Sequence, residues 1–345
     1  MPINIYTEED GIDRLINSGG QLSGSLGVII IGRNEGLRLV TCLSSVVNKA
    51  VAVIYVDSGS MDSSVVMAQS LGVDVVELDS SIPFTAARAR NAGFERLHKN
   101  NPDILYVQFV DGDCEIVDGW LNAAIAVLKI EPKIGIVCGR LRERYPESSV
   151  YNLLCDMEWD VPSGKVKGCG GIFMVRATLF SEVGGFNEKL IAGEEPELCI
   201  RMRNLGWDVM RLKDEMALHD AAITHVGQWW HRAMRGGHAF AEGVYLHGNS
   251  PERHCVVESV RIWIWGIFVP VFIFIAAILD ASFLMLLLVY PVQVVRIALK
   301  LGRQKKANWV YAFFMVLGKF PEFQGQWKFC FGKLFKSAST IIEYK

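Results

Sequence analysis

Short apolar runs alternate with helix-length amphipathic segments over the first third of this chain. Because strands that alternate with helices pair side by side in one sheet, the pattern predicts a doubly wound α/β fold with a mostly parallel sheet. In such a sheet, ligands bind beyond the carboxyl ends of the strands. The runs expected to form these strands are Leu26–Ile31, Val51–Val56, Val73–Leu78 and Ile104–Val110.

The run Ile104–Val110 ends abruptly in Asp111-Gly112-Asp113. Residues two apart on extended backbone point to the same side, so both carboxylates are expected to leave the strand end together. Gly112 between them would let a ligand approach the backbone closely. Paired carboxylates suit Mg²⁺ or Mn²⁺, and such an ion can hold a diphosphate. An isolated Asp-x-Asp is also an ordinary polar turn, so the other motifs have to decide between these interpretations.

Charge and cysteine content exclude several classes of protein. With a net charge of -2 and 21% charged residues, the chain lacks the basic character of a nucleic-acid binder. Its eight cysteines are scattered without a Cys-x-x-Cys pair, which predicts a reducing compartment and no disulfide framework. Residues 1–25 are interpreted as a loose leader without a signal peptide, so residues up to about 255 are expected to stay in the cytosol.

The segment 262–299 is interpreted as a membrane hairpin that follows a linker over residues 246–261. Ile262–Leu279 carries no charge, and after Asp280 a second apolar run covers Phe283–Val295. A single helix over the segment would be about 57 Å long, far beyond a hydrocarbon core of about 30 Å. Two spans joined by a tight turn at residues 280–282 fit better, each close to the minimum length. A buried hairpin in a soluble protein and a re-entrant hairpin are the alternatives.

Basic residues dominate the chain beyond the hairpin. Ten Lys or Arg follow Val295, against Glu322 and Glu343, so both ends of the hairpin are expected on the cytosolic side. The tail, residues 300–345, is also aromatic, which favours an interfacial segment on anionic membrane lipid.

Five motifs follow one another along the chain: Val28–Glu35, Asp57–Asp62, Ala89–Gly93, Asp111–Asp113, and Val183–Phe186 followed by Glu194–Arg201. In this order they resemble a family 2 glycosyltransferase over roughly residues 26–240, and a catalytic domain is expected at residues 26–245. This family is inverting and has a Rossmann-like fold of the glycosyltransferase A type. No single motif is specific, but the ordered set is.

The resemblance implies a role for each matching residue. Glu195 is implied as the base that deprotonates an acceptor hydroxyl, with Glu194 beside it as a second catalytic candidate. Asp57 is implied to hydrogen-bond the nucleotide base, and Asp113 with Asp111 to bind Mn or Mg on the diphosphate. The remaining residues expected to contact the nucleotide-sugar are Arg33, Glu35, Arg88, Arg90, Asn91, Gly171 and Arg232.

The chain departs from the family pattern at three places. The base is Glu195 where the family usually has Asp, and Cys114 stands where many relatives have a third acid. Gln228–Arg232 only approximates the Gln-x-x-Arg-Trp signature of processive synthases, so one sugar is expected per encounter. Acidic residues such as Glu194 and Glu197 also suit a helix N-terminus for purely structural reasons.

Six of the seven histidines lie between residues 219 and 254. His219 is interpreted either as a third metal ligand or as a hydrogen-bonded histidine at a domain edge. His225, His231 and His238 recur at helical spacing, which favours packing near the acceptor site over a zinc cluster.

Other functions explain the motifs less well. A nicotinamide dehydrogenase would need Gly-x-Gly-x-x-Gly after the first strand, and this chain lacks it. The remaining alternatives are a sugar nucleotidyltransferase and a catalytically inactive nucleotide-sugar-binding membrane scaffold. The prediction is therefore a metal-dependent hexosyltransferase at the inner or plasma membrane with a cytosolic catalytic domain. It would move one sugar from a nucleotide-sugar donor, a UDP-sugar by resemblance, to a lipid-linked or saccharide acceptor in polysaccharide or glycolipid assembly.

Overall fold

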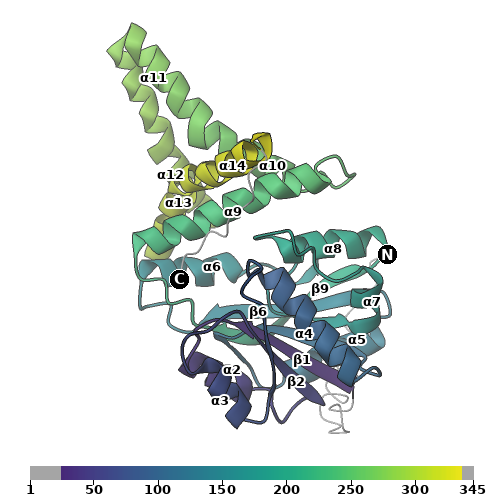
Figure 1. Ribbon diagram of the computed structural model, residues 1–345. Helices are drawn as coiled ribbons and strands as arrows, with labels where there is room; N and C mark the ends of the chain where they lie inside the picture. Colours follow the sequence, from purple (N-terminus) through teal and green to yellow (C-terminus); the bar gives the residue numbers. More distant parts are fainter. Residues whose placement is uncertain (1–24, 336–345) are drawn as a thin grey trace, which may run out of the picture. The chain divides into compact units, whose positions relative to one another are not determined.

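The computed structural model describes residues 25–335, and these residues form two compact units (Figure 1). The first unit comprises residues 25–144, Glu158–Lys189 and Glu194–Ala221. The second comprises Tyr145–Met157, Leu190–Gly193 and the described chain from Ala222 onward. The predicted leader lies outside the described residues except for its last residue, as does the end of the predicted tail.

One sheet of nine strands, in the order β3-β2-β1-β4-β8-β6-β9-β5, forms the centre of the first unit, with β7 paired to β9. Strands β1 to β4 are all parallel, as predicted, whereas β8 runs antiparallel to both of its neighbours, β4 and β6. The strands are β1 (Leu26–Gly32), β2 (Ala52–Asp57), β3 (Asp74–Glu77), β4 (Tyr106–Asp111), β5 (Cys114–Ile116), β6 (Ile134–Glu143), β7 (Gly164–Val166), β8 (Phe173–Arg176) and β9 (Asp208–His219). The doubly wound α/β fold is thus confirmed, with a mixed second half.

Helix α4 (Ala86–Asn100) packs against β1 and β2 (Figure 1). Gly93 makes this close approach possible, because a Cβ there would lie 2.4 Å from Ile29 Cγ2 and 2.9 Å from Val56 Cγ2. The Oγ1 atom of Thr85 caps the helix by accepting a backbone N–H from its first turn. The other helices wholly within this unit are α2 (Leu37–Ser44), α3 (Ser64–Ser70), α5 (Trp120–Ile130), α7 (Ala177–Glu182) and α8 (Glu194–Asn204).

Strand β6 is longer than the short apolar run Ile134–Cys138 predicts. It continues to Glu143 because it pairs with β9 along its whole length, and register shifts follow Cys138 and Arg140. The extension places Glu143 directly opposite His219 at the end of β9.

The second unit is helical and contains the two long apolar helices of the predicted hairpin, here called the apolar pair. A continuous helix covers Val256–Leu279 and a second covers Ala281–Leu301, and both are long and apolar enough to cross a membrane. Both are longer than the predicted spans, because the first begins before Ile262 and the second extends beyond both ends of Phe283–Val295. The break between them lies at Asp280, whereas the turn was expected over residues 280–282. The elements are α6 (Val150–Trp159, shared with the first unit), α9 (Val226–His247), α10 (Val256–Trp263), a π-helical turn (Ile264–Phe268), α11 (Val269–Leu279), a 3₁₀ segment (Ala281–Leu288), α12 (Val289–Leu301), α13 (Lys306–Leu317) and α14 (Lys319–Leu334).

Helices α9 and α14 lie side by side with their backbones in contact (Figure 1). A Cβ on Gly237 of α9 would lie 1.9 Å from the Glu322 carbonyl oxygen, and one on Gly325 of α14 would lie 1.9 Å from that of Met234. Helix α14, the second helix after the apolar pair, is therefore packed on α9, the helix before the pair.

Candidate active site

Arg90 of α4 is the centre of a buried ion-pair group, and only 2% of its surface is exposed. Its Nη2 atom lies 2.9 Å from Asp111 Oδ1 at the end of β4. Its Nη1 atom lies 2.9 Å from Glu194 Oε1 and 3.1 Å from Glu195 Oε1, both in the first turn of α8. One guanidinium therefore joins the end of a central strand to the start of α8.

Gly171, just before β8, lies against this group. A Cβ at this position would be 2.6 Å from Arg90 Nη2, 2.7 Å from Asp111 Oδ2 and 3.3 Å from Glu195 Oε1. Its neighbour Gly170 has open space where its Cβ would be. Only a residue without a side chain fits at position 171 without displacing the ion pairs.

Glu195 has the electrostatic properties of a proton acceptor at neutral pH. Burial raises the pKa of its carboxyl to about 7, and the charge of Glu194 contributes to the rise, while Arg90 opposes it. A carboxylate with a pKa near the working pH is suited to general base catalysis.

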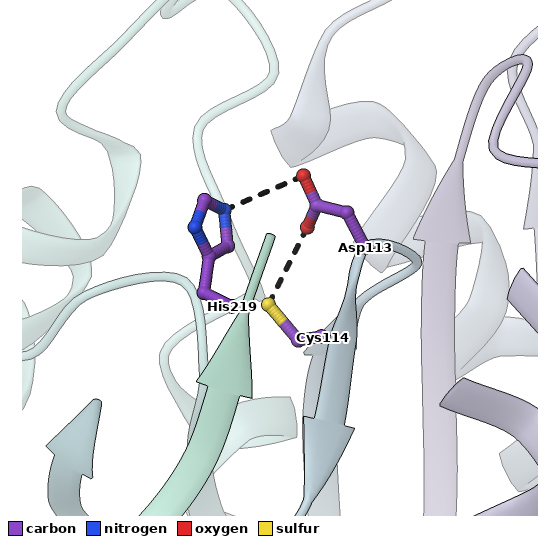
Figure 2. Close-up of side chains that lie close together, drawn as sticks. All are labelled: Asp113, Cys114 and His219. Carbon is purple, nitrogen blue, oxygen red and sulfur yellow. Dashed lines mark hydrogen bonds and ion pairs between the residues drawn. The ribbon is translucent and has the colours of Figure 1, made fainter. Parts of the chain in front are cut away.

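Asp113 and His219 meet where β4 turns into β5 and where β9 ends (Figure 2). His219 Nε2 lies 3.4 Å from Asp113 Oδ2, and His219 Nδ1 lies 3.5 Å from Glu143 Oε2. A carboxylate behind an imidazole is a common way to orient a metal-ligating histidine. The Asp220 N–H donates to the Asp113 carbonyl oxygen at 3.0 Å, which fixes the backbone of the turn. A carboxylate and an imidazole fit a divalent cation.

Cys114 stands in the same place and belongs to the same cluster. Its Sγ lies 3.4 Å from Asp113 Oδ1, and Cys114 is the direct cross-strand partner of His219 (Figure 2). One ligand atom from each of Asp113, Cys114 and His219 lies within 4.8 Å of the others. Burial raises the pKa of the Cys114 thiol, and the charges of Asp113 and Asp111 raise it further.

Asp57 organises the loop after β2, and its carboxylate accepts several hydrogen bonds from the protein. Tyr55 Oη donates to Oδ1 at 2.9 Å, and the backbone N–H groups of Gly59 and Ser60 donate to Oδ2 at 2.9 and 2.7 Å. The Ser60 hydroxyl donates to Oδ1 as well. Asp57 is only 2% exposed. Its contacts in the structure are thus those of a loop-ordering residue.

Arg33 and Arg88 both lie over the ring of Phe84, with their Cζ atoms 5.8 and 5.9 Å from the ring centroid. Arg88 also donates to the carbonyl oxygens of Ile82 at 2.8 Å and Asp79 at 3.0 Å, so it holds the loop before α4.

The other predicted nucleotide residues also have protein partners. The side-chain amide of Asn91 donates to the Phe186 carbonyl oxygen and accepts from its N–H, both at 2.9 Å. Glu35 pairs with Arg38 at 2.7 Å. Arg232 lies on α9 in the second unit.

The structure therefore gathers most of the predicted catalytic and metal residues into two groups. Asp111 and Asp113, expected to act together, have different partners: Asp111 pairs with Arg90, and Asp113 lies with His219. Sequence reasoning missed Glu143 altogether and noted Cys114 only as a missing acid. The position of Cys114 directly after the Asp-x-Asp motif was a usable signal, whereas nothing in the local sequence marks Glu143.

Comparison with protein families identifies part of this unit. Residues 27–165 match the model of glycosyl transferase family 2, and the match runs from within β1 to within β7 and contains Arg90, Asp111 and Asp113. No curated protein matches the chain by sequence.

Solved structures resemble the chain in fold. The mannosyltransferase PcManGT from Pyrobaculum calidifontis, solved in complex with GDP-Man and Mn²⁺, has a TM-score of 0.59 at 15% identity, and the match covers 94% of this chain and 93% of that one. TarS from S. aureus has a TM-score of 0.44 at 15% identity, covering 66% of this chain and 44% of that one. Glucosyl-3-phosphoglycerate synthase from Mycobacterium tuberculosis, with Mn²⁺, UDP-Glc and glycerol 3-phosphate, has a TM-score of 0.46 at 17% identity, covering 63% and 78%.

Proposed function

Because residues 27–165 form a glycosyl transferase family 2 domain, we propose that this protein is a membrane-attached, metal-dependent, inverting glycosyltransferase. It moves one sugar from a nucleotide-diphospho-sugar to a hydroxyl group. The fold of the first unit is that of the glycosyltransferase A type, and the similar mannosyltransferase was solved with a nucleotide-sugar and Mn²⁺.

The observation that carries this proposal is the contact of one guanidinium with both a strand-end carboxylate and a carboxylate of raised pKa. Arg90 holds Asp111 and Glu195 within 3.1 Å of its Nη atoms, beside the backbone of Gly171.

In the proposed reaction, Glu195 accepts the proton of the acceptor hydroxyl, and the resulting oxygen attacks the anomeric carbon in line with the departing diphosphate. A single displacement inverts the configuration, so an α-linked donor yields a β-linkage. Arg90 positions Glu195, and Glu194 stabilises the Arg90 charge at 2.9 Å.

Asp113 and His219 would hold the divalent cation, and Glu143 would orient the imidazole from behind. When bound, such a cation neutralises charge that develops on the leaving nucleoside diphosphate. Asp111, the more exposed of the two carboxylates, would face the donor sugar or its diphosphate.

The loop ordered by Asp57, with Arg33 and the Phe84 ring next to it, is the proposed site for the base and ribose. A UDP-sugar is the proposed donor by family resemblance. Asp57 would help to bind the base in two ways. It holds the loop in shape, and its carboxylate could give up a hydrogen bond from the protein to accept one from the base.

The apolar helix pair is the basis for proposing membrane attachment and a lipid-linked acceptor. Its surface carries large exposed apolar side chains, including Leu279 at 84% and Phe274 at 68% exposure. A contiguous apolar surface of this kind is characteristic of contact with lipid or another protein. An enzyme attached in this way would meet acceptors that are themselves held in the membrane.

The experiment that tests the proposal uses the full chain in detergent micelles with a panel of nucleotide-sugars, with Mn²⁺ in one series and Zn²⁺ in another. We expect one donor to stabilise the protein against heat and to be hydrolysed to nucleoside diphosphate and free sugar, with water as the acceptor hydroxyl. Glu195→Gln should lower the turnover rate by about 10²- to 10⁴-fold while leaving donor-induced stabilisation intact.

Glu182→Gln, at the exposed end of α7, is the control and should keep the wild-type rate. Tight binding of a donor without any turnover by the wild-type protein would instead identify the chain as a nucleotide-sugar-binding scaffold.

A further inference from the structure

The cluster at the end of β9 contains a sulfur atom that the proposed Mn²⁺ chemistry does not use. Cys114 and His219 are directly opposed in the antiparallel β5–β9 pair. Side chains of directly opposed residues lie on the same face of a sheet, so the thiol and the imidazole point the same way. Asp113 completes the group from the preceding turn (Figure 2).

The spacing of the three donor atoms suits a small tetrahedral ion. Zn²⁺ binds sulfur at about 2.3 Å and nitrogen or oxygen at about 2.0–2.1 Å, so its tetrahedral ligand atoms lie about 3.3–3.6 Å apart. Cys114 Sγ lies 3.4 Å from Asp113 Oδ1, and His219 Nε2 lies 3.4 Å from the other carboxylate oxygen, Oδ2. With one ligand atom taken from each residue, the three donors lie within 4.8 Å of one another, so they must draw together slightly to bind one ion.

Charge also favours a sulfur ligand. Asp113 is 7% exposed and Cys114 is 1% exposed, so a divalent cation there is largely removed from water. One carboxylate and one thiolate neutralise its two charges, with the thiol proton passing to solvent as the ion binds. A cation-bound thiol loses its proton outright.

We propose that Cys114 Sγ is a metal ligand and that Asp113, Cys114 and His219 form a three-ligand site selective for Zn²⁺ or Co²⁺ over Mn²⁺ and Mg²⁺. This inference rests on the proposed function only in placing the donor diphosphate at the fourth position. Sulfur is a poor ligand for Mn²⁺ and Mg²⁺ and a good one for Zn²⁺. The residue after the Asp-x-Asp motif therefore sets the metal preference of the site.

The test reads the metal–sulfur bond directly. The full chain in detergent micelles is stripped of metal with a chelator and titrated with CoCl₂. We expect a near-ultraviolet thiolate-to-cobalt charge-transfer band and the strong visible bands of tetrahedral Co²⁺. Cys114→Ser should lose the charge-transfer band, whereas Cys138→Ser, which removes another buried cysteine outside the cluster, should keep it.

A second measurement compares metal affinities. Cys114→Ser should weaken Zn²⁺ binding at least about tenfold and change Mn²⁺ binding much less, because only Zn²⁺ loses a preferred ligand. An unchanged charge-transfer band, or an unchanged ratio of Zn²⁺ to Mn²⁺ affinity, would overturn the proposal.

If Cys114→Ser does not fold, ¹¹³Cd NMR of the wild-type protein answers the same question. A resonance in the range of mixed sulfur, nitrogen and oxygen ligation supports the proposal, and one in the oxygen-only range overturns it. These readouts are independent of sugar transfer. A wild-type protein with the cobalt–sulfur band but no transferase activity would contradict the proposed function alone.

Discussion

Arg90 carries one positive charge and is surrounded by three carboxylates, those of Asp111, Glu194 and Glu195. Arg90 and Glu194 are buried and Glu195 is nearly so, whereas Asp111 is 35% exposed. The surplus of negative charge around them is therefore costly, and it is relieved if one carboxyl keeps its proton. Glu195 is the member whose pKa rises to about 7. The surplus of negative charge therefore opposes ionisation of Glu195 and raises its pKa. Because its pKa is raised, the ionised carboxylate would be a stronger base.

The raised pKa makes the reaction rate depend on pH. Protonated Glu195 cannot accept a proton, so kcat/KM should rise with pH and level off above about 7. A profile that is flat between about pH 5.5 and about pH 8.5 would show that another group is the base.

The free energy of unfolding should fall as the pH rises, whereas kcat/KM should increase. The folded protein binds the Glu195 proton more tightly than the unfolded chain does, so this proton stabilises the fold at pH below the usual pKa of 4.5. The stabilisation is lost as the pH rises through about 7. Glu195→Gln, which does not titrate, should therefore show a smaller drop in unfolding midpoint between about pH 5 and about pH 8 than the wild type.

Gly171 and Gly170 offer a matched pair of substitutions. Gly171→Ala places a methyl 2.6 Å from Arg90 Nη2 and 2.7 Å from Asp111 Oδ2, so the ion pair must move. We expect turnover to fall by about 10²-fold, because displacements near 1 Å at reacting groups have effects of that size. Gly170→Ala meets open space and should retain activity. Equal activity in both variants would show that the contact at Gly171 has no part in the reaction.

At the level of single residues, the sequence motifs predicted some contacts of the candidate site and missed others. The motifs anticipated that Arg90, Asp111 and Glu195 belong near one sheet edge, and the structure brings them together. Asn91 and Arg88 both donate to loop carbonyls, and a local motif does not disclose these partners. Glu143 and Cys114 meet His219 only through strand register between segments far apart in the chain, and no short-range pattern encodes that register.

At the level of elements, the position of Arg90 depends on how closely α4 approaches the sheet. Gly93→Ala would place a Cβ 2.4 Å from Ile29 Cγ2 and 2.9 Å from Val56 Cγ2. Overpacking of this kind costs about 1–3 kcal/mol, against a gain of about 1 kcal/mol in helix propensity. We expect a net loss of stability in chemical denaturation. Lys99→Ala, on the exposed side of α4, is the control, and a stabilised Gly93→Ala would contradict this account.

The alternating pattern of strands and helices predicted the parallel strands β1 to β4 well, because each lies within a local strand–helix–strand unit. The second half of the sheet was harder to predict. Strand β6 continues through Arg140 and Arg142 to Glu143, and these charged residues end the apolar run that marks a buried strand. Pairing with β9 compensates for the loss of that pattern, and such pairing is a long-range property.

At the level of the whole molecule, the apolar pair predicts a defined topology. If both helices span, a biotin-acceptor peptide inserted after Asp280 should react only from the side of the membrane opposite the first unit. The same peptide inserted after Lys305, beyond the second helix, should react from the side of the first unit. Labelling of both insertions from one side would show a re-entrant hairpin instead.

The close packing of α14 on α9 has a consequence for making a water-soluble form of this protein. Ending the chain before Val256 would remove α14 and leave the Gly237 face of α9 bare, which invites aggregation. Deleting the parts of the two apolar helices next to Asp280, and joining the remaining helix ends with a short flexible loop, would keep α14 in place. A water-soluble form should therefore lack the residues around the hairpin turn at Asp280 and retain α14.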